Sequence, residues 1–303
     1  MEGFNTIGCD ALNIGSKDLL AGVDFVRELE QSADFPFVSA NIIDKESGEL
    51  LFESYVVVER GGLTVGITGI TSKIPDVIGN VSLIDPVEAA DEALASLEKK
   101  SDYQIVLFNG SQDEAKAVRE KLVSADYMFL SGNTKNPRHT AKNPETGPRL
   151  YSLGKQGKYL AILRLDIKNS RESVADITTL KAKETFILRQ MDRMQQKDPS
   201  KTLEQIYADN RKTLERLHQI QNELKSIRGE LVEVGNSAQF DYVPMSRILD
   251  DEPLLLSMIT ETLSACDRLA VANDEHRELL KASKIDPVIK QQLESKYRAK
   301  KSG

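Results

Sequence analysis

Three short polar segments carry the side chains best suited to binding chemistry. The first contains Ser16 and Lys17, Asn109 follows an apolar run, and Asn133 and Lys135 follow the next apolar run. Amide and ammonium groups donate hydrogen bonds to anions, whereas a protonated ammonium has no lone pair to offer a metal ion. Side chains of these types can hold an anion such as phosphate or a nucleotide. The simpler alternative is that the two lysines are solvated surface groups.

Other residue types that often do chemistry are sparse. The two cysteines, Cys9 and Cys266, lie far apart in the sequence, which excludes a disulfide framework and a CxxC metal or redox motif. His139 falls in a polar segment, and His218 and His276 fall on predicted helices without a matching partner. We therefore expect these histidines to be surface residues rather than metal ligands.

Length and charge set further limits. The chain has 303 residues, enough for two domains of roughly 100 to 200 residues each. Its formal charge of −7 argues against a generally basic surface for nucleic-acid phosphates. No apolar run approaches the ~20 residues that span a bilayer, and Met1 to Asp10 lack a basic segment followed by an apolar one. We expect no membrane span and no export signal at this start.

The three polar segments lie in the first part of the chain, residues 1–176, where two kinds of sequence pattern alternate. Short β-branched runs alternate with helical stretches, which is typical of an α/β fold. Tyr55 to Glu59 and Leu63 to Gly69 flank Arg60-Gly61-Gly62, which predicts a tight hairpin. Tyr103 to Phe108 and Tyr127 to Leu130 are predicted strands that directly precede two of the polar segments.

The second half, residues 177–303, is predicted to be a mainly helical domain. Apolar residues recur at alternating steps of three and four, which predicts a long antiparallel helical hairpin. The hairpin is either a protruding coiled coil or an ordinary core face packed on the first half. The predicted seam comprises Leu203, Ile206, Leu217, Ile220, Leu224, Ile227 and Leu231 with Asn210 and Thr213, and the facing helix presents Phe186, Ile187, Met191 and Met194.

The segment from Gly8 to Asp18, with Gly22, Asp24 and Phe25 behind it, resembles one motif of the calcineurin-like metallophosphoesterases, in their 5′-nucleotidase branch. The resemblance continues through Pro36 to Asn41 and Gly62 to Gly69, and covers about residues 6 to 167. It implies a sandwich of two β-sheets flanked by helices. It also implies a two-metal site at the carboxyl ends of the strands, where paired divalent ions activate water.

Carried over position by position, the resemblance implies that the metal site is lost. The family's asparagine ligand aligns with Ser16, its catalytic histidine with Lys17 and its later strand-end histidine with Asn109. The two histidines of its GHxH motif fall on Asn133 and Lys135, so no matched position keeps an imidazole. The prediction is therefore no catalytic residue, no metal ligand and no cofactor, with these five side chains as a hypothetical anion pocket.

The family's first strands have no counterpart here, so the resemblance implies an incomplete sandwich with an uncovered strand edge. Candidate covers are Met1 to Thr6, a helix of the second half, a second copy of the chain or an additional N-terminal segment. The helical region and this edge are thus the predicted surfaces for a protein partner or a homo-oligomer.

Together these observations predict a non-catalytic homologue of the 5′-nucleotidases that acts as a scaffold or as an anion- or partner-binding module. The alternative is a metal-dependent hydrolase of nucleotides or other phosphoric esters, with a divalent metal pair as its cofactor. Family analogy points to the periplasm or cell envelope, although the start of this chain leaves its location open.

Overall fold

In the computed structural model, the chain forms two compact units. One unit is Cys9–Ser246, and the other joins Met1–Gly8 to Arg247–Gly303. The residues described are 1–75, 78–132, 146–152, 154, 157–169, 172–246 and 248–282.

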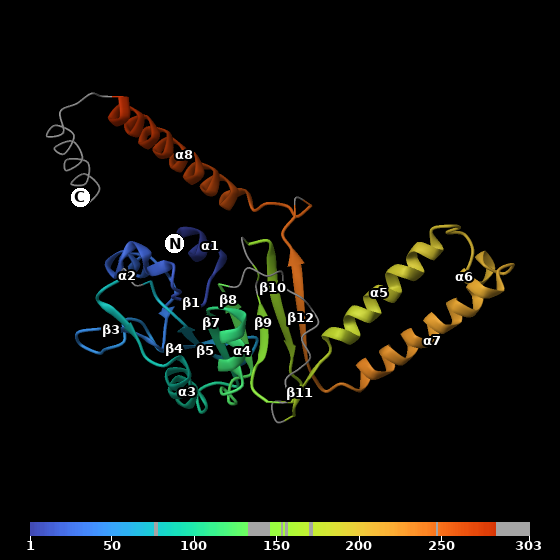
Figure 1. Ribbon diagram of the computed structural model, residues 1–303. Coiled ribbons are helices and arrows are strands. Elements are labelled where there is room, and N and C mark those ends of the chain that lie inside the picture. The colour runs from blue at the N-terminus through green and yellow to red at the C-terminus, as the bar shows by residue number, and fades with distance from the viewer. Residues whose placement is uncertain are drawn as a thin grey trace. The chain divides into compact units, whose positions relative to one another are not determined.

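A five-stranded sheet forms the centre of the larger unit (Figure 1). The β4–β5 pair is antiparallel, and each following pair is parallel. Gly61 and Gly62 adopt φ angles of 59° and 80° between β4 and β5, which confirms the predicted tight hairpin. In sheet order the strands are β4 (Tyr55–Arg60), β5 (Leu63–Thr71), β7 (Tyr103–Asn109), β8 (Tyr127–Ser131) and β9 (Arg149–Ser152).

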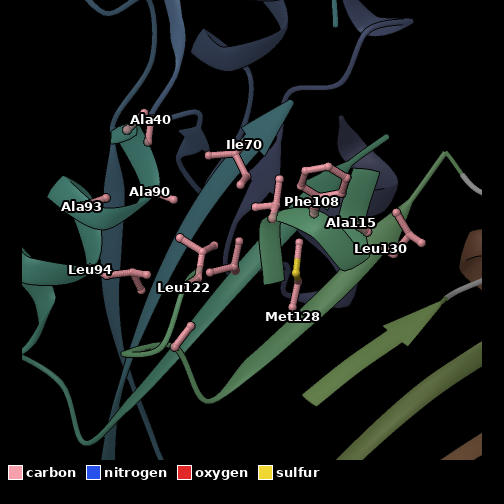
Figure 2. Close-up of a cluster of buried hydrophobic side chains, with 14 residues drawn as sticks. Ala40, Ile70, Ala90, Ala93, Leu94, Phe108, Ala115, Leu122, Met128 and Leu130 are labelled. Carbon is pink, nitrogen blue, oxygen red and sulfur yellow. The ribbon is translucent and has the colours of Figure 1, made fainter. Parts of the chain in front are cut away.

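Two helices, α3 (Pro86–Leu97) and α4 (Gln112–Arg119), cover one face of this sheet. Alternate residues of each strand point to that face, and they pack against small and branched side chains of the helices. Figure 2 shows this core, in which Ile70, Phe108 and Met128 are fully buried. The predicted helix from Gln112 to Val123 is shorter than expected, because α4 ends at Arg119.

A three-stranded sheet packs on the opposite face. Its order is β10 (Tyr159–Asp166), β12 (Asn236–Pro244) and β11 (Val174–Asp176). The ring of Phe240 on β12 stacks on Tyr151 of β9, with ring centroids 3.7 Å apart and an interplanar angle of 8°. The layers are therefore helices, five strands and three strands, which confirms the predicted α/β sandwich of two sheets.

Strand β12 comes from the half that was predicted to be helical. It pairs antiparallel with β10 and parallel with β11, so the middle strand of the second sheet is contributed from beyond residue 176. The predicted boundary between residues 176 and 177 stays a prediction.

A helical hairpin lies between β11 and β12 in the chain, as predicted. It consists of α5 (Thr178–Gln195), the short α6 (Leu203–Ile206) and α7 (Arg211–Glu233). Ile187 of α5 packs against Ile220, Leu224 and Ile227 of α7. Two details of the predicted seam are wrong: Phe186 is exposed, and Asn210 is the N-cap of α7, where its side chain accepts a hydrogen bond from the Thr213 backbone. The coiled coil stays a prediction.

Smaller elements complete the larger unit. The strand β1 (Leu12–Asn13) pairs parallel with β2 (Phe37–Val38), and β3 (Ile42–Asp44) pairs antiparallel with β6 (Val81–Leu83). The 3-10 helix η1 (Asp18–Ala21) and α2 (Val23–Gln31) follow β1.

The smaller unit consists of two described helices. They are α1 (Glu2–Ile7) and α8 (Pro253–Ala282), which contact each other. None of the helices in the described ranges combines the length and apolar character needed to cross a membrane.

Candidate functional site

The carboxyl ends of three parallel strands meet at one edge of the five-stranded sheet. The register aligns Thr71 of β5 with Asn109 of β7, and Asn109 with Ser131 of β8. Each of these three neighbouring strands therefore ends in a polar side chain. The residues that precede it in the strand are largely apolar. Carboxyl ends of parallel strands are where α/β proteins commonly bind ligands.

The carboxamide of Asn109 lies at the centre of this row. Its Oδ1 accepts a hydrogen bond of 3.1 Å from the Ser16 backbone N–H, and its Nδ2 donates one of 3.0 Å to the Ser131 hydroxyl. The Ser131 hydroxyl in turn donates to the Phe108 carbonyl at 3.3 Å. Each end of the carboxamide thus makes one hydrogen bond within the protein, and these two bonds use one of its two N–H donors and one of its two lone pairs.

Gly15 is needed for this approach. A Cβ at Gly15 would lie only 2.7 Å from the Asn109 Nδ2, closer than Cβ atoms approach other atoms. The same loop is held on two other sides. The Gly15 N–H donates to the Asp18 carboxylate at 2.8 Å, and the Thr71 hydroxyl donates to the Ile14 carbonyl at 2.6 Å. The loop that carries Ser16 and Lys17 is therefore fixed to the ends of β5 and β7.

Lys17 stands out from this fixed loop. Its backbone precedes η1, and its side chain is exposed. Within the described part of the chain no carboxylate forms an ion pair with it. Lys17 therefore presents an exposed positive charge one residue after Ser16, whose backbone contacts Asn109.

A second polar group borders the row and carries negative charge. The Glu114 carboxylate accepts hydrogen bonds from the Ser111 backbone N–H at 2.7 Å and from the Ser72 hydroxyl at 3.2 Å. Hydrogen bonds from the Ser111 side chain and backbone, with smaller effects of Ser72 and Lys73, lower the pKa of Glu114. This carboxylate stays ionised and closes the capping box at the start of α4.

The residues described at this edge include no imidazole. A site for a pair of divalent cations needs imidazole, carboxylate or amide oxygens with free lone pairs directed at the metal. Here the Asn109 oxygen receives an N–H group, and the adjoining positions carry a hydroxyl and an ammonium. Across the described ranges, no group of three or more His, Cys, Asp or Glu side chains is arranged to hold a metal ion.

Three of the five predicted site residues lie in the described part of the chain. Ser16 and Asn109 are in direct hydrogen-bond contact, through the Ser16 backbone rather than its hydroxyl, and Lys17 is the next residue in the loop. Asn133 and Lys135, like His139, lie outside the described residues. The anion pocket as a whole stays a prediction.

Sequence reasoning missed Ser131 and Glu114. Ser131 could have been found from its place directly after an apolar strand, the same position that singled out Asn109. Glu114 could have been found from the spacing Ser-x-x-Glu in residues 111–114, the pattern of a capping box.

Part of the chain is similar in sequence to known proteins. No protein-family model matches it. A curated 5′-nucleotidase of Vibrio cholerae is 32% identical over 112 residues, which is 35% of this chain and 20% of that protein. Protein UshA of Escherichia coli is 35% identical over 95 residues, or 30% of this chain and 17% of that protein. Over about a third of its length, this chain resembles the 5′-nucleotidases.

The 5′-nucleotidase-like chain spans only about a fifth of the length of these curated relatives. Among solved structures, the calcineurin-like phosphoesterase YfkN of Bacillus subtilis aligns with 57% of this chain and 63% of its own, at a TM-score of 0.48 and 22% identity. The 5′-nucleotidase precursor of Thermus thermophilus aligns with 55% of this chain and 37% of its own, at a TM-score of 0.45 and 24% identity.

Proposed function

We propose that this 5′-nucleotidase-like chain is a non-catalytic binding module that holds a phosphate-type anion at the strand-end edge around Lys17 and Asn109. The observation that carries the proposal is the commitment of the Asn109 carboxamide to Ser16 and Ser131. The resemblance implies a metal-binding imidazole at position 109. This chain has Asn109 there, and its amide links the Ser16 loop to the end of β8.

Positive and negative charges both lie at this edge, and only the positive charge of Lys17 favours an anion. Lys17 offers an exposed ammonium, and a hydrogen-bonded ammonium can hold a phosphate oxygen. The two nearby carboxylates are already engaged within the protein, Asp18 with the Gly15 N–H and Glu114 with Ser111. Their hydrogen bonds reduce, but do not remove, their repulsion of an incoming anion, so we expect weak to moderate affinity.

The test is calorimetric titration of the purified chain with inorganic phosphate and, separately, with Mn²⁺. We expect phosphate to bind and Lys17→Ala and Lys135→Ala each to weaken it several-fold. Lys99→Ala is the matched control, because exposed Lys99 follows α3 close to the start of β7, at the opposite end of that strand from Asn109. Equal phosphate binding by all four proteins, or none by the wild type, would overturn the anion site.

The competing function is metal-dependent hydrolysis of a phosphoric ester, which the names of the curated relatives favour. It is tested by the Mn²⁺ titration together with an assay of nucleoside monophosphate hydrolysis. Tight binding of two metal ions per chain with metal-dependent turnover would establish the hydrolase and reject the non-catalytic module. We expect neither.

A further inference from the structure

A serine followed by a lysine occurs twice at the strand-end edge. Ser16 and Lys17 lie in the loop after β1, and Ser72 and Lys73 directly follow β5. The side chain of Lys73 is exposed, like that of Lys17. The anion site proposed above contains no residue from the loop after β5.

Asn109 contacts both of these loops. Its side-chain Oδ1 accepts a hydrogen bond of 3.1 Å from the Ser16 N–H, and its backbone carbonyl accepts one of 2.9 Å from the Ser72 N–H. The backbones of both serines are therefore held by atoms of a single residue. Lys17 and Lys73 each come one position later, so both lysines leave the backbone at the carboxyl end of β7.

The two loops are also tied directly to each other. The Thr71 hydroxyl donates a hydrogen bond of 2.6 Å to the Ile14 carbonyl, and both residues are fully buried. Because these contacts are internal to the protein, the two lysine-bearing loops are preorganised for a shared ligand. Preorganisation reduces the ordering cost of binding.

Each lysine brings hydrogen-bond donors that the protein does not use. In the part of the chain that the structure describes, neither the Lys17 nor the Lys73 ammonium forms an ion pair, and neither backbone N–H has an acceptor. Ammonium and amide N–H groups are the donors that phosphate oxygens accept. Two loops that offer both kinds of donor can hold one oxyanion from two sides.

Glu114 lies beside the second of these loops. Its carboxylate accepts a hydrogen bond of 3.2 Å from the Ser72 hydroxyl, and the positive charge of Lys73 contributes to lowering its pKa. The carboxylate is therefore ionised at neutral pH and within electrostatic reach of the Lys73 ammonium. It competes with an incoming anion for that ammonium.

We propose that Lys73 is a second cation of the anion site, and that a phosphate-type oxyanion is held between Lys17 and Lys73. This inference rests on the proposed function and extends it by assigning the loop after β5 to the site. Glu114 then sets the affinity, because its carboxylate and the anion share the Lys73 ammonium.

The test is calorimetric titration of the purified chain with inorganic phosphate at neutral pH and low salt. Lys73→Ala should weaken phosphate binding about threefold to fivefold, as expected for an exposed charge contact. Lys73→Arg keeps the positive charge and should stay within about twofold of the wild type. Lys99→Ala is again the matched control, at the opposite end of β7. Urea midpoints check that each variant is folded.

Glu114→Gln tests the competition, because glutamine still accepts from the Ser111 N–H and keeps the start of α4. It should tighten phosphate binding about twofold to threefold in the wild-type background, and by less when position 73 is alanine. An equal effect in both backgrounds would overturn the role of Glu114.

The outcomes separate the two proposals. Phosphate binding that is weakened by Lys17→Ala but unchanged by Lys73→Ala would overturn this inference and leave the anion site standing. Equal losses for Lys73→Ala and Lys99→Ala would also reject Lys73, because they would reflect only the net charge of the chain. A wild type that does not bind phosphate would overturn both proposals.

Discussion

The backbone N–H of Ser16 donates a hydrogen bond to the Asn109 side chain across 93 positions of sequence. This single contact ties the loop after β1 to the carboxyl end of β7. It also uses one of the two lone pairs of the Asn109 oxygen.

Asn109→Ala should lower the free energy of unfolding by about 1 to 3 kcal/mol, because the partly buried Ser16 N–H and Ser131 hydroxyl lose their partner. Urea denaturation measures the change. Asn109→Asp is the matched control, since a carboxylate still accepts from Ser16, and it should cost less. An alanine variant as stable as the wild type would contradict the structural role of this carboxamide.

Phe240→Ala should cost about 3 to 5 kcal/mol, because it removes a fully buried ring from between the two sheets. Phe186→Ala makes the same chemical change at an exposed position, and its effect should stay within about 0.5 kcal/mol. Equal losses of stability for the two variants would mean that the sheets do not pack through Phe240.

Gly62→Val should destabilise the β4–β5 hairpin by about 1 to 2 kcal/mol, because a branched side chain is strained at a φ of 80°. Gly61→Asn should be tolerated, since asparagine commonly occupies the first position of this turn type. Thermal unfolding compares the two variants. A valine variant with an unchanged melting temperature would show that the turn relaxes to another conformation.

Alkaline pH should destabilise the protein through its buried tyrosines. Burial raises the pKa of Tyr151 and that of Tyr242 to about 12, from an ordinary value of 10.0. Since the folded-state pKa lies above the unfolded value, the neutral phenols contribute stability that is complete below about pH 10 and is lost as the pH rises towards about 12. Tyrosinate absorbance and urea midpoints measured together should show this loss.

Tyr151→Phe provides the control for the alkaline prediction, because it removes one titrating group while keeping the ring that stacks on Phe240. Its stability should fall less steeply than that of the wild type above about pH 10. Identical slopes for the two proteins would mean that Tyr151 ionises as easily in the folded state as in the unfolded chain.

Local patterns were enough to predict much of the fold. The Arg60-Gly61-Gly62 turn, the strands before Asn109 and Ser131, and the apolar seam of the hairpin each depend on residues close together in sequence. Phe186 was assigned wrongly for a geometric reason. It precedes Ile187 by one residue, and a step of about 100° around a helix turns its side chain away from the seam.

By itself, the sequence determined the residue types at the strand ends, which carry amide and hydroxyl side chains. It also determined the periods of strand and helix, since these follow from neighbouring residues. Only the tertiary structure decided that Asn109 bonds to Ser16, that β12 enters the second sheet between β10 and β11, and that Phe186 faces outward beside a hollow. The hydrogen bond and the strand order depend on segments far apart in the chain, and the hollow beside Phe186 also needs Glu223 of α7, so no local pattern encodes them.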